Sequence, residues 1–385
     1  PFGLGPLRCR VLASQRCRAR RPSLTLVLRD DVRSKARRLG YPQRFDSFAL
    51  WTLKIMDASS HLLLDTAYRK PCHRRPVWLM RQAGRYLPEY QAVRARHDFL
   101  TMCKTPEIAV EISLQPWRRF RPDGVIVFSD ILFIPEALGQ VLEFVPGPKL
   151  SPAIRTSAQI HSLRVPEPNE ATPHILESIR LLRRELTDEV PVLGFCGAPW
   201  TLAAYMVEGE HSRQLQHIKG LRYTEPEALH ALLDVLTDSL VAYARAQIEA
   251  GAQLIQVFDS FAHELTPADF AEFAAPYNAR LIAEIRREGV PITLFSKGCA
   301  GLLEQLAGCG PDVISLDWTI DLAEAKARVG DRVALQGNFD PLFLLAPPER
   351  IERVVRDQLR AYGGDHGWIG NLGHGVLPFI AAEHV

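Results

Sequence analysis

The chain of 385 residues is long enough for one α/β barrel of ordinary size together with terminal extensions. Its 47% hydrophobic and 23% charged residues are typical of a globular protein, and no apolar run approaches the roughly 18 residues that a membrane-spanning helix needs. The seven cysteines are scattered and form no CxxC or HxC pair. This pattern disfavours a zinc site and indicates free thiols in a reducing compartment.

The net charge of +2 hides an asymmetry between the N-terminal segment and the rest of the chain. Residues 1–44 contain eleven Arg and one Lys against two Asp, a local charge of +10 that leaves −8 on the remainder. An organelle transit peptide and sequence upstream of a start at Met56 are equally favoured interpretations. A nucleic-acid arm is disfavoured because the segment lacks interleaved aromatic residues and the body is acidic. We expect residues 1–55 to be a disordered basic extension and residues 56–385 to form the barrel domain.

Eight short runs rich in Val, Ile, Leu and Phe recur from residue 75 onward, separated by segments of helical periodicity. They cover residues 76–82, 124–131, 191–196, 252–260, 291–297, 313–318, 333–338 and 367–372. Continuous apolar runs are typical of parallel strands that are buried on both faces. The alternation therefore predicts an α/β fold, a single-domain (β/α)8 TIM barrel.

Helices are expected between these runs, and several of them begin with Pro near the first turn. They cover residues 106–120, 226–250, 267–288, 301–307, 322–329 and 348–362. Residues 141–164 are rich in Pro and Gly near position 147, so we expect an excursion over the barrel mouth. The chain ends about a dozen residues after the last predicted strand. The C-terminal helix that covers that strand is therefore expected to be truncated, short or absent.

Polar residues gather at the carboxyl ends of the predicted strands, where barrel enzymes place their active sites. Arg81 and Arg85 follow the first run, and Arg94 lies further along. Their guanidinium groups suit bidentate contacts to carboxylates or phosphates. Salt bridges on a surface helix are the alternative, and the strand-end position favours a ligand. Clustered arginines on an acidic body indicate a polyanionic ligand, whereas the absence of a GxGxxG or GxxxxGK[ST] loop disfavours a nucleotide.

Four further strand-end residues are candidates for ligand contacts. Asp130 closes an apolar run, so its carboxylate needs a partner; a cationic or NH-bearing ligand is favoured over a helix-capping role. His374 lies between two glycines, where the backbone can approach a ligand closely and the imidazole can donate or accept. Tyr205 and Ser260 can donate hydrogen bonds to a ligand carboxylate, although each alone is more often a structural hydroxyl.

Other charged strand-end residues are interpreted as structural. Lys297 could form a Schiff base, but a salt bridge at the rim is favoured because its FSKG setting gives no sign of a lowered pKa. Asp317 and Asp340 are likewise assigned structural roles. The histidines at positions 211, 217, 230 and 263 lack ligand spacing, so no metal site is expected.

Several of these strand-end segments together resemble the signature segments of the uroporphyrinogen decarboxylase family, in the family's order. They are RPVWLMRQAGRYLPEY (residues 75–90), FSDIL (128–132), GAPWTL with YMVEG (197–209), QGNFDP (336–341) and NLGHG (371–375). The resemblance runs from about Met56 to Val385. It implies a carboxy-lyase without metal or organic cofactor, a homodimer in the cytoplasm, with a plastid as the alternative if the leader is a transit peptide. It would remove CO2 from the four acetate side chains of uroporphyrinogen III to give coproporphyrinogen III in haem and chlorophyll biosynthesis, with no nucleic-acid or membrane partner.

The resemblance also implies roles for individual residues. Asp130 resembles the carboxylate that gathers the pyrrole NH groups, and the arginines with the backbone near Ala83 resemble the groups that hold substrate carboxylates. A pyrrole protonated at its α-carbon can accept the electrons released with CO2, so the predicted catalytic residues are Asp130, which stabilises the cation, and Arg81. Arg81 is a doubtful proton donor because of its high pKa, and a bound water is the alternative. The predicted substrate-binding residues are Arg81, Gln82, Ala83, Arg85, Arg94, Asp130, Tyr205, Ser260 and His374.

Two departures from the family pattern lie near the predicted mouth. His263 stands where the family has a small residue, and Glu210 with a following histidine replaces glycine after YMVEG. We expect the added bulk to narrow the mouth. A corrinoid- or zinc-dependent methyltransferase is disfavoured because no HxC or paired thiolates occur at strand ends, and a tetrapyrrole-binding barrel without catalysis would not need Asp130.

Overall fold

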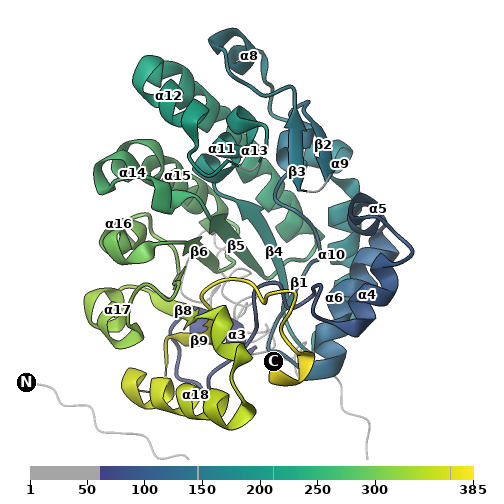
Figure 1. The fold of residues 1–385 in the computed structure, drawn as a ribbon, viewed down its shortest axis with the longest axis vertical. Helices are drawn as coiled ribbons and strands as arrows, with labels where there is room; N and C mark the ends of the chain where they lie inside the picture. The colour runs from purple at the N-terminus through teal and green to yellow at the C-terminus, as the bar shows by residue number, and fades with distance from the viewer. Residues whose placement is uncertain (1–60, 145–146, 211, 365) are drawn as a thin grey trace, which may run out of the picture. The chain divides into compact units, whose positions relative to one another are not determined.

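The structure, a computed structural model, describes residues 61–144, 147–210, 212–364 and 366–385 (Figure 1). Residues from Ser60 to Val385 form one compact unit. The expectation of a disordered extension over residues 1–55 lies outside the described residues. Within them, no helix is both long and apolar enough to cross a membrane.

A parallel sheet forms the centre of this unit, and its order follows the chain. Its strands are β1 (Val125–Ile126), β4 (Val192–Gly197), β5 (Leu254–Asp259), β6 (Ile292–Ser296), β7 (Val313–Ser315), β8 (Ala334–Phe339) and β9 (Trp368–Leu372). Each pairs in parallel with the next, as for β5 and β6, where Ile255 stands opposite Ile292. Consecutive parallel pairing with helical crossovers is the pattern of a βα barrel.

Residues 76–79 close the ring between β9 and β1. Val77 forms a parallel bridge with Gly370 of β9, and Gly370 N donates to Pro76 O at 2.8 Å. On the other side Asp123 N donates to Val77 O at 2.8 Å, and Val77 N donates to the Asp123 carboxylate. The predicted (β/α)8 barrel is thus confirmed as a fold, although the first predicted strand, residues 76–82, is reduced to this bridge.

Helices surround the sheet and return the chain to the start of each next strand (Figure 1). The α-helices are α3 (Leu62–Ala67), α4 (Pro88–Arg94), α5 (Phe99–Lys104), α6 (Pro106–Phe120), α7 (Phe133–Ala137), α8 (Ser157–Ser162), α9 (Pro168–Ala171), α10 (Pro173–Leu186), α11 (Pro199–Glu208), α12 (Gln216–Thr224), α13 (Pro226–Ala250), α14 (Pro267–Phe273), α15 (Ala275–Arg286), α16 (Leu303–Gly308), α17 (Leu322–Val329) and α18 (Pro348–Tyr362). Short 3-10 turns are η2 (Ala262–Glu264), η3 (Cys299–Gly301), η4 (Pro341–Leu345) and η5 (Ala382–His384).

The helix boundaries follow local sequence signals. The longest helix, α13, has Pro226 in its first turn and ends at Gly251, whose φ of 117° suits a residue without a side chain. Helix α17 begins after Asp321, whose carboxylate accepts hydrogen bonds from the N–H groups of Ala323 and Glu324. The predictions for residues 106–120, 226–250, 322–329 and 348–362 are confirmed. The predicted helix over 267–288 is wrong as a single element, because it is broken at Ala274 into α14 and α15.

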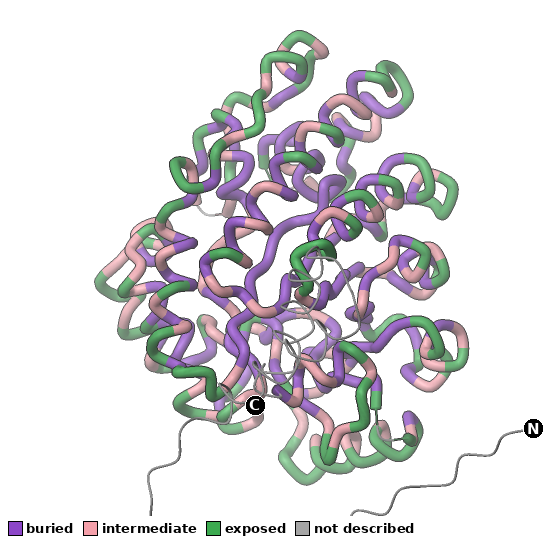
Figure 2. Tube along the Cα trace, turned by 180° about the vertical axis from the view of Figure 1, so that it is seen from behind, coloured by how far each residue is buried: buried purple, intermediate pink, exposed green. Residues whose placement is uncertain are grey.

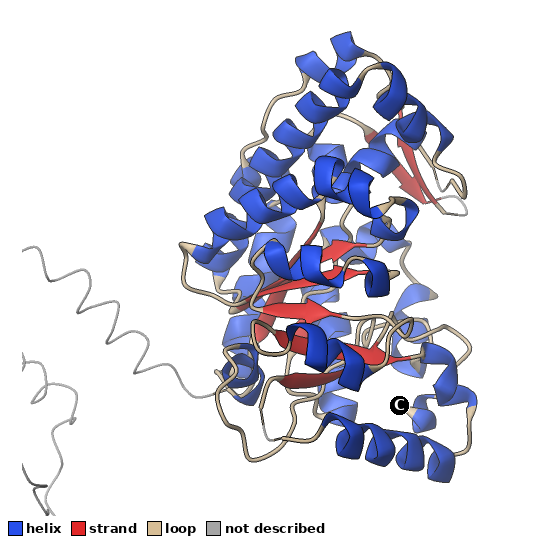
Figure 3. Cartoon of the chain, turned by 90° about the vertical axis from the view of Figure 1, so that its left-hand side faces the viewer, coloured by secondary structure: helices blue, strands red, loops and turns tan. Residues whose placement is uncertain are grey.

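The excursion after β1 is an antiparallel hairpin of β2 (Val141–Phe144) and β3 (Pro148–Ser151), set apart from the barrel strands (Figure 3). Leu150 N donates to Gly209 O, and the Gln140 amide donates to Met206 O at 3.2 Å. The hairpin is therefore fixed to the C-terminal end of α11. Glu143, Phe144, Gly147 and Pro148 of the hairpin line the cavity at the barrel mouth, so the hairpin forms one of its walls.

Buried residues are concentrated in the strands and on the inner sides of the helices (Figure 2). The barrel interior is filled by Trp78, Leu193, Leu254, Phe295, Val313, Ala334 and Ile369. Between Gly373 and Val385 the chain forms η5 and no α-helix. Instead Gly373 N donates to Phe339 O and Val376 N donates to Met80 O, so this segment lies beside residues 80–81 at the barrel mouth.

Candidate active site

A cavity of about 1420 Å³ opens at the carboxyl ends of the strands, which is larger than the roughly 300–1,000 Å³ of ordinary small-molecule pockets. Eight of the nine predicted substrate-binding residues line it. They are Arg81, Ala83, Arg85, Arg94, Asp130, Tyr205, Ser260 and His374. Residues far apart in the sequence are thus brought to one site by the barrel, as the strand-end rule predicts.

Gln82 is the exception, because it does not line the cavity. Its side-chain oxygen accepts a hydrogen bond from Leu79 N at 3.1 Å, and its side-chain nitrogen donates to Gly124 O at 3.0 Å. The residue is buried, at 2% exposure. Its amide therefore fixes the turn after residue 79 to the start of β1. This place outside the cavity lining favours a structural role for Gln82, and its contact with the substrate stays a prediction.

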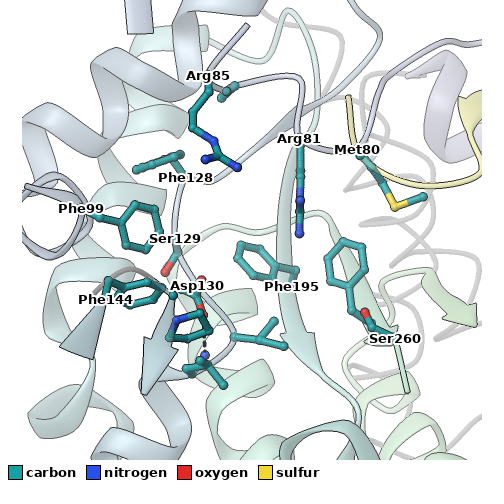
Figure 4. A pocket seen from close by; sticks show the side chains of 18 of the residues that line it. Met80, Arg81, Arg85, Phe99, Phe128, Ser129, Asp130, Phe144, Phe195 and Ser260 are labelled. Atoms are coloured by element: carbon teal, nitrogen blue, oxygen red, sulfur yellow. Dashed lines mark hydrogen bonds between the residues drawn. The ribbon is translucent and has the colours of Figure 1, made fainter. Parts of the chain in front are cut away.

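Arg81 owes its position to an unusual backbone and to a glycine opposite. Its φ is 56°, in the left-handed region, at a turn closed by the Gln82 N–H donating to Leu79 O at 2.9 Å. A Cβ at Gly375 would overlap the Arg81 side chain, so the Gly-His-Gly segment allows the guanidinium stem to pass. Figure 4 shows Arg81 and Arg85 projecting into the cavity from the same stretch of chain.

The three arginines are not neutralised by the protein. Within the described part of the chain, neither Arg81, Arg85 nor Arg94 forms an ion pair with a carboxylate, and each lines the cavity. Guanidinium groups gathered without an ion-paired carboxylate attract anions into the cavity. The arrangement therefore favours a ligand with several carboxylates or phosphates.

Asp130 lies across the cavity from the arginines and is half-buried in the cavity wall (Figure 4). One carboxylate oxygen, Oδ1, accepts a hydrogen bond from Leu132 N at 2.9 Å. The other accepts no hydrogen bond from the described residues and is available to a ligand. Burial raises the pKa of Asp130 to about 6, an effect that the Leu132 N–H bond and the Arg81 charge partly oppose. The group is thus largely ionised at neutral pH in a poorly hydrated setting.

Tyr205, Ser260 and His374 add polar groups to the lining. Tyr205 extends from α11 and packs on Phe261, with ring centroids 5.0 Å apart. Burial lowers the pKa of His374 to about 4, helped by the positive charges of Arg81 and Lys297. His374 is therefore neutral at physiological pH and can donate one hydrogen bond and accept another. Its ring meets Phe295 edge-on at 5.9 Å.

Aromatic residues that we did not predict form much of the remaining wall. Those that line the cavity are Tyr90, Phe99, Phe128, Phe144, Phe195, Phe258, Phe261 and Phe295. Phe99 packs on Phe144 of the hairpin with centroids 4.5 Å apart. Apolar residues at strand ends are indistinguishable in sequence from core residues, so no sequence signal identified them.

The residues assigned structural roles divide into two groups. Asp317 accepts hydrogen bonds from Gly298 N at 2.6 Å and from the Thr319 hydroxyl, and Asp340 accepts one from Leu342 N, so both structural assignments are confirmed. Lys297 lines the cavity and forms no ion pair with any described residue, so the predicted rim salt bridge is wrong. His263 also lines the cavity, as expected for a residue at the mouth.

A metal site needs several His, Cys, Asp or Glu side chains close together, and the described residues offer no such cluster. The five cysteines in the described range carry free thiols, and burial raises the pKa of Cys299 to about 12. The polar groups of the cavity are therefore guanidinium, ammonium, hydroxyl, imidazole and carboxylate groups.

The fold and the site define a (β/α)8-barrel protein whose anion-attracting cavity contains the half-buried carboxylate of Asp130. A family model described as uroporphyrinogen decarboxylase matches residues 58–385, and the chain belongs to this family.

Curated relatives carry the same name. Uroporphyrinogen decarboxylase from Nitrosococcus oceani is 47% identical over 324 residues, covering 82% of this chain and 91% of that protein. The protein of that name from Geobacter sulfurreducens is 46% identical, covering 83% and 94%. A solved structure, a methyltransferase from Methanosarcina mazei, matches with a TM-score of 0.72 at 21% identity, covering 84% of this chain and 94% of that one. This last likeness concerns the fold alone.

Proposed function

We propose that the protein is a cofactor-independent carboxy-lyase that removes CO2 from the four acetate side chains of uroporphyrinogen III, giving coproporphyrinogen III in porphyrin biosynthesis. The observation that carries the proposal is the combination, in one large cavity, of arginines that form no ion pair with a described carboxylate and the half-buried Asp130 carboxylate, one oxygen of which accepts no hydrogen bond from the described residues. Membership of the uroporphyrinogen decarboxylase family supports it. A polycarboxylate tetrapyrrole offers both the anions and the N–H donors that these groups lack.

The chemistry follows from the charge that develops during the reaction. Protonation of a pyrrole at its α-carbon gives an iminium-like cation, into which the electrons of the breaking C–C bond flow as CO2 leaves. The neutral exocyclic methylene that results takes a second proton to become the methyl group of the product. Loss of the first proton from the α-carbon then restores the aromatic pyrrole, so each CO2 released consumes one proton. An ionised Asp130 whose free oxygen accepts the pyrrole N–H stabilises that cation more than water could, because it is already oriented in a poorly hydrated cavity.

The remaining residues bind and orient the substrate. Arg81, Arg85 and Arg94, together with the backbone at Ala83, receive side-chain carboxylates. Tyr205, Ser260 and His374 donate hydrogen bonds around the tetrapyrrole ring. Because His374 is neutral, the arginines and not His374 supply positive charge to the substrate carboxylates. Arg81 contributes positive charge near the reacting acetate, and its high pKa favours a bound water over the guanidinium as proton source.

The proposal extends to the organisation of the protein. Residues 56–385 form the catalytic domain, it acts as a homodimer in the cytoplasm, and it takes a small-molecule substrate without nucleic acid or membrane. Light scattering on the purified chain would test the dimer: a mass near one chain, 43.2 kDa, at micromolar concentration would contradict it.

The test of function is anaerobic turnover of uroporphyrinogen, with carboxyl loss followed by chromatography, with and without a chelator. Asp130→Asn should lower kcat by on the order of a hundredfold or more, as removal of one preorganised charge-stabilising group does. Asp357→Asn, on the exposed face of α18, is the matched control and should leave turnover unchanged. Chelator-sensitive turnover, or an Asp130→Asn variant as active as the control, would contradict the mechanism.

A further inference from the structure

Lys297 contributes a positive charge to the cavity, and none of the substrate contacts proposed above involves it. It follows β6 directly and lines the cavity. In the ring of eight βα units, residues 76–79 occupy the first position and β6 the fifth. Lys297 therefore enters from the side of the barrel opposite to the segment that carries Arg81 and Arg85.

The two carboxylates near Lys297 are already engaged by other groups. Asp317 accepts from Gly298 N on one oxygen and from Thr319 N at 3.2 Å and the Thr319 hydroxyl at 2.5 Å on the other. Glu264 pairs with Lys219 at 2.6 Å and lies 3.3 Å from the His263 ring nitrogen. Neither carboxylate forms an ion pair with Lys297, and the Lys297 ammonium donates no hydrogen bond to any described residue.

The backbone after Lys297 is held firmly, so the position of the lysine is defined by the fold. Gly298 adopts a φ of 67°, and a Cβ there would lie 2.6 Å from the Cβ of His263. The loop is thus packed between His263 on one side and Asp317 on the other. Burial is the main cause of the lowered pKa of both His263 and His374, and the charge of Lys297 adds to the effect in each case. Lys297 therefore lies within electrostatic range of two sides of the cavity.

We propose that Lys297 forms a second carboxylate-binding subsite, which holds a side-chain carboxylate of the porphyrinogen while another acetate reacts near Asp130. The inference rests on the proposed function and assigns part of its substrate specificity. An ammonium group in a partly enclosed cavity without a protein anion gains most from an anionic ligand.

The choice of lysine at this place suits a substrate that reacts four times. An ammonium is a compact charge with three rotatable donors, whereas guanidinium demands a planar, bidentate partner. As each acetate in turn takes the reacting position near Asp130, a different side-chain carboxylate of the substrate comes to lie beside Lys297. Lys297 can hold any of them without a fixed orientation, and His263, in contact with the same loop, limits the space beside it.

The experiment compares Lys297→Met, Lys297→Arg and, as the matched control, Lys70→Met, which removes an exposed ammonium paired with Asp65. Anaerobic equilibrium binding is measured with uroporphyrinogen, using the extent of decarboxylation as a check, and with coproporphyrinogen, which is not consumed. Loss of one charge-assisted contact should weaken binding on the order of tenfold in Lys297→Met. Lys297→Arg should recover most of the affinity, and Lys70→Met should bind like the wild type.

A second readout separates charge recognition from a structural effect. Affinity for the polyanion should fall with ionic strength in the wild type, and less steeply in Lys297→Met, because one screened attraction is missing. In turnover, KM should rise while kcat changes little, since the carboxylate that Lys297 holds is not the one that reacts.

The possible results separate a failure of the Lys297 subsite from a failure of the proposed decarboxylase activity. Wild-type protein that does not decarboxylate uroporphyrinogen contradicts the proposed function, while the binding series still tests Lys297. Lys297→Met that binds both porphyrinogens as the control does, or that loses affinity with an unchanged salt dependence, overturns the subsite. Circular dichroism and thermal unfolding of all three variants verify that each is folded.

Discussion

The surroundings of the Asp130 carboxylate disfavour its ionised form. Burial raises its pKa to about 6 from an ordinary value of 3.8, against the opposing effects of the Leu132 N–H bond and Arg81. A substrate that brings N–H donors to the free oxygen would recover part of this cost. Asp130 is therefore a site residue that lowers the stability of the folded protein without substrate.

Replacing Asp130 should reveal that cost as a change in stability. The carboxyl group is harder to ionise when folded, so its penalty is present above pH 6 and disappears as the pH falls below about 4, where both states are protonated. Asp130→Asn should therefore raise the free energy of unfolding by about 1–2 kcal/mol at pH 8, with the difference fading toward pH 4. Urea unfolding at several pH values measures it. A variant that is less stable than wild type at pH 8 would contradict the assignment of an unfavourable buried charge.

The positions of the site residues could be predicted from the sequence better than the directions of their side chains. Strand-end positions correctly brought Arg81, Asp130 and His374 to one cavity, because the barrel topology fixes where each strand ends. The orientation of Gln82 depends on the left-handed backbone of Arg81 and the turn from Leu79, which no period-two pattern contains. Lys297 was misassigned because its sequence does not show that the nearby carboxylates are already engaged by backbone groups.

At the scale of elements, a buried carboxylate ties three of them together at the end of β5. Asp259 is fully buried and accepts hydrogen bonds from the Thr201 hydroxyl of α11 at 2.7 Å and from the Asn278 amide of α15 at 3.1 Å. Thr201 Oγ1 in turn accepts from Phe261 N at 3.1 Å. This network fixes the turn after β5 that presents Ser260 to the cavity.

Thr201→Val should disrupt that network while conserving shape. It removes one donor to a buried carboxylate and the acceptor of the Phe261 N–H, so we expect a loss of about 2–3 kcal/mol in the free energy of unfolding. The KM for uroporphyrinogen should also rise, because Ser260 follows Asp259 directly. Thr224→Val, at an exposed position of α12, is the control. Chemical denaturation and steady-state kinetics measure both effects, and equal stability of the two variants would rule out the coupling.

The elements that were predicted incorrectly have identifiable local causes. The helix over residues 267–288 breaks at Ala274 because Pro276 lacks an N–H and its ring opposes a continuous helix through the preceding turn. That signal was present in the sequence. The first strand shrinks to a bridge at Val77 because the Met80 N–H donates to the Asn371 side chain, at 3.0 Å, rather than to a strand carbonyl. No local pattern could reveal a partner 291 positions away.

At the scale of the whole molecule, barrel closure depends on this weakly paired segment. A buried polar network inside the barrel supplies hydrogen bonds to the first segment beyond its few backbone pairs. The Trp78 indole N–H donates to Gln336 Oε1 at 2.9 Å. The Gln336 amide in turn donates to Ser315 Oγ at 2.9 Å and to Gln256 Oε1 at 3.2 Å. Trp78 and Gln336 are both fully buried. The network connects the first βα unit to β5, β7 and β8 through the barrel interior.

A double-mutant cycle on this network tests whether it closes the barrel. Gln336→Met conserves volume but leaves the indole N–H and Gln256 Oε1 without a partner, which should cost about 2–4 kcal/mol of unfolding free energy. Trp78→Phe removes the indole donor and leaves a cavity. Because each change already breaks the shared hydrogen bond, the double variant should be less destabilised than the sum of the two, by about 1–2 kcal/mol. Trp318→Phe, at a partly exposed site, is the control for loss of an indole. Strictly additive free energies from urea unfolding would mean that Trp78 holds the first segment by packing alone, and that the hydrogen bond to Gln336 contributes nothing to closure.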